Sequence, residues 1–247
     1  MKILVIGGTG LTGGKVSREL KEAGHEIVIG SPSNGVNILN GKGLAEALEG
    51  TDIVIDLSNS TSPDDETALN FFRTAAKNLI PAEKLAGIKH HLVLSIVGTD
   101  RVQHIGYLRA KKEQEDNVKE SGIPYTIIRS TQFYEHVTTI IAVQGNEQEA
   151  HVSTVDYQPI AVDDVAKLIA RFALEEPKNS IVEIAGSEKA AMTEFVQRYM
   201  DSEGSQKKLV VNNEDKYMYF DIPRDLLVPL DSFYTGPTSF EAWLKSK

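Results

Sequence analysis

The sequence predicts an α/β fold with a doubly wound, mainly parallel sheet and a small lobe in the C-terminal part. Short apolar runs alternate with helical stretches through the first half of the chain. These runs are continuous stretches of Val, Ile and Leu, which is typical of strands that helices cover on both faces. With 41% hydrophobic and 25% charged residues over 247 positions, the chain can form an apolar core without disulfides.

The N-terminal part shows the clearest alternation of strands and helices. The first helix would place Val16, Leu20 and Ala23 on one face and end at Gly24. A polar loop that contains Pro and Gly follows the second strand. In chain order we expect a strand over 3–6, a helix over 11–23, a strand over 26–29, a short strand over 36–39, a short helix over 43–49 and a strand over 52–56.

The alternation continues through the rest of the chain. Asp64 or Asp65 is placed to cap a long helix, and Asp163 to cap a later one. We expect one unit over 1–247, in which the core lies mainly in 1–140, 160–186 returns to it, and the remaining C-terminal segments form a smaller, substrate-side lobe. Further helices are expected near 65–86, 105–121, 133–143 and 163–174, and further strands over 91–95, 125–129, 180–185 and 208–211.

The composition argues against several classes of function. The chain has no cysteine, which excludes disulfides, thiolate catalysis and cysteine zinc sites. The net charge is −9, and acidic residues follow the basic cluster at 109–112, so we expect no nucleic-acid partner. His90 and His91 would point to opposite faces of a strand, so we expect no metal site. No segment approaches the roughly 18 apolar residues of a membrane span, and we expect a cytoplasmic protein.

A glycine-rich turn follows the first expected strand and opens the first expected helix. Residues 8–13 match the pattern G-x-G-x-x-G, in which the glycines allow a tight turn, approach of a pyrophosphate and close packing of helix on strand. The free N–H groups at the helix start favour phosphate. The sequence therefore predicts that this turn binds NAD(P). The residues expected at the cofactor here are Gly7, Thr9, Gly10, Leu11, Thr12 and Gly13.

The end of the second strand is expected to select between NAD and NADP. NAD sites usually carry a carboxylate there for the ribose hydroxyls, whereas this chain has residues 30–34, Gly-Ser-Pro-Ser-Asn. Ser31 and Ser33 are placed to bond a 2′-phosphate, although no Arg or Lys stands beside them. These observations favour NADP and leave NAD open.

A second motif lies in the helix expected over 105–121. Tyr107 and Lys111 are four residues apart and so share a helix face, where Lys111 is expected to lower the pKa of the phenol and make Tyr107 a general acid. Ser95 ends the preceding strand and is expected to hold a substrate carbonyl. The alternative is a surface helix that happens to carry a tyrosine and a lysine.

In these motifs the chain resembles the atypical short-chain dehydrogenases/reductases, in the NmrA-like, NAD(P)H-quinone-reductase-like branch. The resemblance implies a Rossmann core and reduction of a quinone or a carbonyl compound. It also implies that Ser58 and Asn59 lie along the cofactor and that Ser130 and Phe133 lie near the nicotinamide. The chain departs from many relatives in having no basic residue at Leu11 or Ser31. The segments that carry the resemblance are 7–13, 91–98, 107–111, 127–133, 158–166 and 238–244.

The leading hypothesis is an NAD(P)-dependent oxidoreductase that transfers a hydride to a small carbonyl or quinone substrate. Two alternatives stay open: a non-catalytic NAD(P)-binding redox sensor that regulates a protein partner, and an isomerase or lyase that keeps its cofactor bound. The sequence does not name the substrate and leaves the oligomeric state open.

Overall fold

The structure is a computed structural model that describes residues 1–60, 62 and 64–247. Its largest sheet has seven strands in the order β13-β8-β5-β4-β3-β1-β2. β1 pairs in parallel with both β2 and β3, and β3 pairs in parallel with β4, which confirms the predicted fold class. The strands are β1 (Lys2–Ile6), β2 (Glu26–Gly30), β3 (Ile53–Asp56), β4 (His90–Ile96), β5 (Tyr125–Ser130), β8 (Ser180–Gly186) and β13 (Tyr234–Gly236).

The chain divides into two compact units. Unit 1 contains Met1–Arg129 and Ala166–Val182, and unit 2 contains Ser130–Val165 and Glu183–Lys247.

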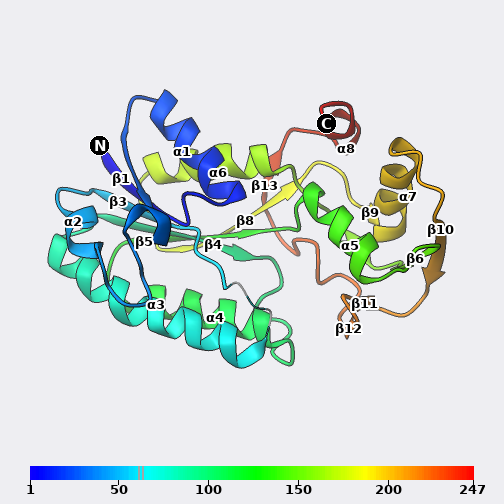
Figure 1. Ribbon diagram of the computed structural model, residues 1–247, viewed down its shortest axis with the longest axis horizontal. Coiled ribbons are helices and arrows are strands. Elements are labelled where there is room, and N and C mark those ends of the chain that lie inside the picture. Colours follow the sequence, from blue (N-terminus) through cyan, green and yellow to red (C-terminus); the bar gives the residue numbers. More distant parts are fainter. Residues whose placement is uncertain (61, 63) are drawn as a thin grey trace. The chain divides into compact units, whose positions relative to one another are not determined.

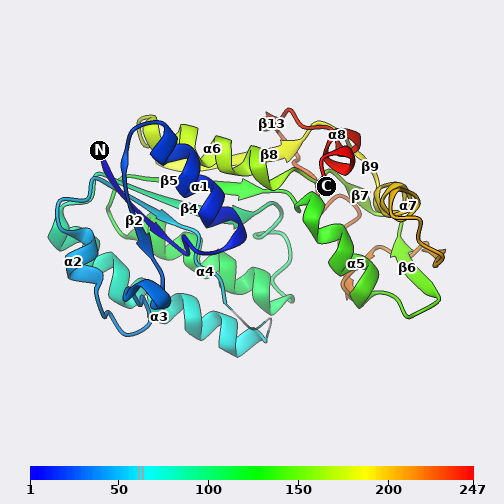
Figure 2. The same cartoon turned by 45° about the horizontal axis from the view of Figure 1, so that its top comes forward.

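Helices cover both faces of the sheet in unit 1. α1 (Leu11–Glu22) and the unit 1 part of α6 (Val162–Leu174) lie on one face, and α3 (Asp65–Ala86) and α4 (Gly106–Glu120) lie on the other (Figures 1 and 2). Asp64 caps α3 as expected, because its carboxylate accepts a hydrogen bond from the Thr67 N–H at 2.9 Å. The continuous Val/Ile/Leu runs are therefore buried from both sides.

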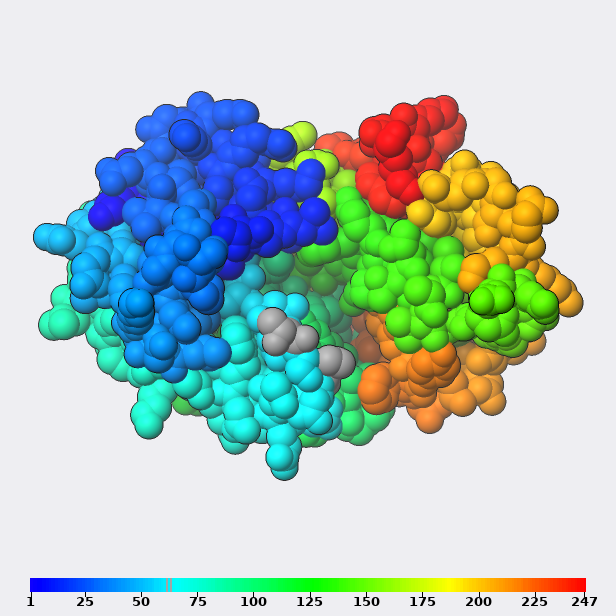
Figure 3. Space-filling view, viewed as in Figure 1, coloured from blue at the N-terminus to red at the C-terminus, as the bar shows by residue number. Residues whose placement is uncertain are grey.

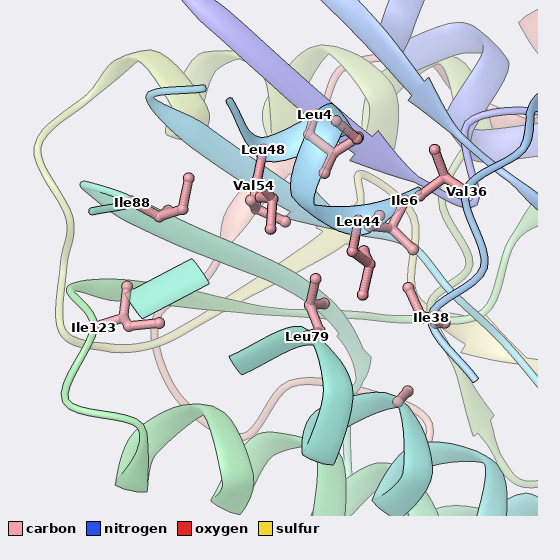
Figure 4. Close-up of a cluster of buried hydrophobic side chains, with 12 residues drawn as sticks. Leu4, Ile6, Val36, Ile38, Leu44, Leu48, Val54, Leu79, Ile88 and Ile123 are labelled. Atoms are coloured by element: carbon pink, nitrogen blue, oxygen red, sulfur yellow. The ribbon is translucent and has the colours of Figure 1, made fainter. Parts of the chain in front are cut away.

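One apolar cluster fills the space between the sheet, α3 and the short helix α2 (Leu44–Leu48) (Figure 4). Val36 and Ile38 belong to this cluster, although the strand expected over 36–39 does not form. The Asn37 N–H instead bonds to Lys42 O, and the Gly41 N–H bonds to Asn37 O. The alternation of apolar and polar residues suggested a strand. It arises instead because Val36 and Ile38 lie in a turn and point into the core.

Unit 2 is built from short strand pairs and an aromatic core. Tyr134, Phe195, Phe240 and Trp243 pack with ring centroids 5.0 to 5.5 Å apart. Instead of one helix over 133–143, a 3₁₀ turn precedes α5. The elements are α5 (Val137–Val143), β6 (Glu149–Ser153), β7 (Asp156–Tyr157), β9 (Ala190–Ala191), α7 (Met192–Ser202), β10 (Lys208–Asn212), β11 (Lys216–Tyr217), β12 (Phe220–Asp221) and α8 (Phe240–Lys245).

The acidic pair at the start of α6 differs from the expectation. α6 begins at Val162, so Asp163 lies within its first turn rather than at the cap. Asp164 is buried and accepts hydrogen bonds from the N–H and the hydroxyl of Thr238 at 2.8 and 3.0 Å. The second carboxylate therefore holds the C-terminal segment of unit 2 in place.

Among the described helices, none is long and apolar enough to cross a membrane.

Candidate functional site

The glycine turn lies at the point where the strand order of the sheet reverses. From β1 the chain first adds β2 on one side and then returns to add β3 on the other, and such switch points are where open α/β sheets bind ligands. Gly7 directly follows β1 and has a φ of 74°. A Cβ on Gly7 would lie 2.7 Å from Leu57 O, after β3. The turn is therefore packed against the segment that follows β3.

The third glycine of the motif lets α1 start close to the turn. A Cβ on Gly13 would lie 2.2 Å from Gly7 O, so only glycine fits. Gly10 has no side chain to cap α1, and the first turn of α1 contains no acidic residue. Thr9, Gly10 and Leu11 are exposed, and the dark blue N-terminal segment reaches the surface of unit 1 in Figure 3. An exposed helix start with free N–H groups beside a glycine cradle fits the pyrophosphate of a dinucleotide.

The polar loop after β2 brings Ser31 and Ser33 together. Their hydroxyl oxygens are 2.9 Å apart, and each also lies within hydrogen-bond distance of Asn34 Oδ1, at 3.0 and 3.2 Å. The Gly7 N–H bonds to Gly30 O at 2.8 Å, which ties this loop to the glycine turn. The loop thus offers two neighbouring hydroxyls and no charge.

Ser58 and Asn59 follow β3 and lie beside the glycine turn. Ser58 N is 3.2 Å from the position that a Gly7 Cβ would take. The Ser58 hydroxyl is buried and has no hydrogen-bond partner among the described residues. Asn59 is exposed, and its Oδ1 accepts a hydrogen bond from the Tyr107 hydroxyl at 2.8 Å.

Tyr107 lies in the first turn of α4 and is held by Asn59 rather than by Lys111. Burial raises the pKa of Tyr107 above its usual value, so the expected lowering by Lys111 is wrong. A phenol with a raised pKa stays protonated at neutral pH. Tyr107 is therefore a neutral phenol that donates a hydrogen bond to Asn59, in the segment that follows β3.

Lys111 points into unit 1. Its ammonium donates to Leu94 O at 2.7 Å and to the side-chain oxygen of Gln114, and it lies 4.9 Å from the centre of the Phe72 ring. Burial lowers the pKa of Lys111 to about 8, although Asp56 and Glu115 favour its charged form. The spacing of four residues places Lys111 one turn from Tyr107, but the sheet and α4 determine what its ammonium bonds.

Ser95 is also engaged inside unit 1. Its hydroxyl donates to Glu115 Oε1 at 2.6 Å, and only 2% of the residue is exposed. Arg129 forms two hydrogen bonds to the same carboxylate, at 2.9 and 2.8 Å, and pairs with Asp100 at 2.9 Å. In this structure Ser95 is part of a buried ionic cluster, whereas the sequence suggested a hydroxyl free to hold a substrate carbonyl.

Ser130 and Phe133 belong to unit 2. The Ser130 hydroxyl donates to Thr131 O at 2.9 Å. Phe133 forms a parallel bridge with Ile160, and the Ile160 N–H bonds to Gln132 O at 2.9 Å. The backbone of unit 2 thus fixes the segment that contains both residues.

Sequence reasoning missed two buried polar residues behind Tyr107. Asp56 ends the apolar strand β3, and its Oδ2 accepts a hydrogen bond from Gln114 Nε2 at 2.7 Å. An aspartate that closes a buried run of Ile and Val is itself a detectable signal, because a buried carboxylate requires partners. Gln114, three residues after Lys111, has no such signature.

The described residues contain no cluster of three or more His, Asp or Glu side chains that could hold a metal ion. His90 bonds to Thr126, and His91 bonds to Glu83. Both histidines are buried and form hydrogen bonds within unit 1.

A Rossmann sheet with a glycine turn at its switch point defines a dinucleotide-binding protein. A family model described as NAD(P)H-binding matches residues 7–177. The chain belongs to this NAD(P)H-binding family, in agreement with the family resemblance noted in the sequence.

Two relatives of known description match most of this chain. The photosystem II assembly factor Ycf39 of Synechocystis sp. is 27% identical over 215 residues, which cover 80% of this chain and 66% of the relative. The (4-alkanoyl-5-oxo-2,5-dihydrofuran-3-yl)methyl phosphate reductase of Streptomyces griseus is 30% identical over 187 residues, which cover 67% of this chain and 62% of the relative. The chain thus spans slightly less than two thirds of the length of each.

Solved structures share the fold at low identity. A dTDP-4-dehydrorhamnose reductase from Clostridium acetobutylicum superposes with a TM-score of 0.77 and 18% identity, over 99% of this chain and 98% of that one. The NADPH-dependent quinone oxidoreductase QOR2 from Escherichia coli, in complex with NADPH, gives a TM-score of 0.66 and 20% identity, over 86% and 78% of the two chains.

Proposed function

We propose that the protein is an NADPH-dependent reductase of a small carbonyl or quinone compound, in the NmrA-like branch of the atypical short-chain dehydrogenases/reductases. The observation that carries the proposal is the position of Tyr107. A protonated phenol is bonded to Asn59 at 2.8 Å, on the segment that packs against the glycine turn. A proton donor beside a dinucleotide site is what reduction of a carbonyl or quinone oxygen requires.

Different residues of unit 1 bind different parts of the cofactor. The turn from Gly7 to Gly13 receives the pyrophosphate on backbone N–H groups. Ser31 and Ser33 receive the 2′ group, and Ser58, whose buried hydroxyl has no hydrogen-bond partner among the described residues, lies along the cofactor. The bound cofactor supplies the hydride. We further propose, from the family resemblance, that Ser130 and Phe133 are cofactor-binding residues.

Asn59 positions the Tyr107 hydroxyl before the reaction. In the reaction the hydroxyl proton leaves its hydrogen bond with Asn59 Oδ1 and is transferred to the substrate oxygen. Lys111 and Ser95, the other two residues of the expected catalytic set, support this arrangement from inside unit 1. Lys111 fixes α4 to β4 through Leu94 O, and Ser95 joins β4 to α4 through Glu115.

The first experiment titrates the purified protein with NADPH and with NADH, followed by cofactor fluorescence, and then adds a panel of quinones and carbonyl compounds. We expect NADPH to bind more tightly than NADH and to be oxidised only when an acceptor is present. Failure to bind either cofactor would refute the proposal at its base.

A second candidate function is a non-catalytic NAD(P)-binding sensor that regulates a protein partner. It is favoured by the engagement of Ser95 and Lys111 in buried hydrogen bonds, which removes two of the three expected catalytic groups from a direct role. Its expected outcome in the same experiment is tight, redox-selective cofactor binding without oxidation by any acceptor.

A further inference from the structure

Asp56 is hydrogen-bonded on both of its carboxylate oxygens. It is the last residue of β3, and only 4% of it is exposed. Oδ1 accepts from the Ser58 N–H at 2.9 Å, and Oδ2 accepts from Gln114 Nε2 at 2.7 Å. One oxygen therefore holds the segment that follows β3, and the other holds α4.

The contact with α4 continues to Lys111. The side-chain oxygen of Gln114 accepts from the Lys111 ammonium, which also donates to Leu94 O of β4. Gln114 and Lys111 are each 4% exposed. The carboxylate, the carboxamide and the ammonium thus form a directional chain, in which each group offers the donor or acceptor that the next one needs.

The two branches from Asp56 meet again at Tyr107. Through Ser58 the first branch fixes the adjacent Asn59, whose oxygen accepts from the Tyr107 hydroxyl. Through Lys111 the second branch fixes the turn of α4 that follows Tyr107. The hydrogen bond between Asn59 and Tyr107 closes a ring of contacts, in which the Asp56 carboxylate is the point where the two branches start.

We propose that Asp56 is a positioning residue, which sets the hydrogen bond between Asn59 and Tyr107 by holding the Ser58 N–H with one oxygen and Gln114 on α4 with the other. The inference rests on the proposed role of Tyr107 as proton donor. Asp56 is buried and has both carboxylate oxygens bonded within the protein, so it acts through Ser58 and Gln114.

Exchanging the carboxylate of Asp56 and the carboxamide of Gln114 tests this arrangement. Asp56→Asn keeps the shape but turns one acceptor into an NH₂ group, which must face either the Ser58 N–H or the NH₂ group of Gln114. Gln114→Glu places a second carboxylate against Asp56. The double variant, with both substitutions, restores every donor–acceptor pair: the new amide donates to the new carboxylate, which still accepts from Lys111.

The measurements are kcat and KM for acceptor reduction, the Kd of NADPH, and the ¹³C resonance of the Tyr107 ring carbon that carries the hydroxyl. We expect each single variant to lower kcat about tenfold or more and to shift the Tyr107 resonance. The Kd of NADPH should change less than about threefold in Gln114→Glu, and more in Asp56→Asn, because Asp56 holds Ser58. The double variant should recover kcat and the resonance to near wild type. Asp116→Asn, on the exposed side of α4, is the matched control and should change neither.

Single variants that fold and keep both kcat and the resonance would overturn the proposal. So would a folded double variant without recovery, which remains decisive where a single variant fails to fold. Tyr107→Phe is measured in parallel and assigns the resonance. Full turnover by Tyr107→Phe would refute the proton donor, and the shift and recovery of the resonance would then still decide whether Asp56 positions Tyr107.

Discussion

At the scale of single residues, Gly13 shows how strictly the glycine turn limits its side chains. Its hypothetical Cβ lies 2.2 Å from Gly7 O, whereas a Cβ on the neighbouring Gly14 would come no closer than 3.9 Å to Gly8 O. Two adjacent glycines at the start of one helix therefore differ completely in their tolerance of a methyl group. The pair supplies a matched test of the turn.

We predict that Gly13→Ala lowers the free energy of unfolding by about 1–3 kcal/mol, because the methyl group must displace backbone, and weakens NADPH binding more than tenfold. Gly14→Ala should be neutral or stabilise by up to about 1 kcal/mol, because alanine favours the helix. Urea denaturation and fluorescence titration measure the two effects. Equal behaviour of the two variants would contradict the packing seen in the turn.

The hydroxyl of Tyr107 gives the second prediction at this scale. Tyr107→Phe removes the proton donor and should lower kcat about 10²- to 10⁴-fold, while the Kd of NADPH changes less than about threefold. Tyr125→Phe, in β5, is the control and should keep kcat. Unchanged turnover in Tyr107→Phe would remove Tyr107 from the reaction.

At the scale of single elements, β4 carries two adjacent histidines with opposite pKa shifts. Burial lowers the pKa of His90 to about 4. The pKa of His91 is raised despite its burial, because the Glu83 carboxylate lies 2.9 Å away and Asp56 adds a further negative charge. The alternation of a strand puts the two rings on opposite faces of the sheet, and the neighbours on each face decide the charge.

Together the two pKa shifts predict that the free energy of unfolding is greatest near about pH 6.5, the pKa of an unfolded histidine. Folded His90 binds fewer protons than the unfolded chain between about pH 4 and the unfolded pKa of about 6.5, so the free energy of unfolding falls on acidification through that range. Folded His91 keeps a proton that the unfolded chain releases above about pH 6.5, so its contribution is lost as the pH rises through its folded pKa.

Urea denaturation between pH 4.5 and 7.5 checks this prediction. His90→Gln should flatten the acid side of the curve, and Glu83→Gln should flatten the side above about pH 6.5. Glu149→Gln is the control, since it removes the partner of the exposed His151 and should leave the curve unchanged. A slope that survives both core substitutions would show that other groups control the pH dependence.

At the scale of the whole molecule, a buried ionic cluster joins several parts of unit 1. The Glu115 side chain is 0% exposed and that of Arg129 is 6% exposed. Their contact joins α4 to β5, Ser95 adds β4, and Asp100 adds the loop that follows β4. The cluster thus fixes how the sheet and α4 meet on the side of the candidate site.

We predict that Glu115→Gln lowers the free energy of unfolding by about 2–4 kcal/mol, because the Arg129 charge then loses its buried carboxylate and keeps only the half-exposed Asp100. Glu113→Gln, at the exposed pair with Arg73, should cost at most about 1 kcal/mol. Urea denaturation of the two variants compares them directly. Similar losses would mean that the cluster is weaker than its burial indicates.

The sequence by itself determined the features that depend on neighbours along the chain. Apolar runs predicted six of the seven strands of the largest sheet, all except β13. Asp64 or Asp65 was expected to begin α3, and Asp64 does so. The glycine spacing predicted a turn that the structure places at the switch point of the sheet. Each depends on local backbone geometry or on periodic burial, which a linear pattern records.

Only the tertiary structure decided what the polar side chains bond. Tyr107 and Lys111 do share a helix, but their partners, Asn59 on one side and Gln114 with Leu94 on the other, come partly from strands that no spacing specifies. Ser95 bonds to Glu115, and Val36 and Ile38 enter the core from a turn. The physical reason is that burial and hydrogen bonding depend on which elements pack against each other in three dimensions. These tertiary contacts outweigh the conformational preference of the local sequence.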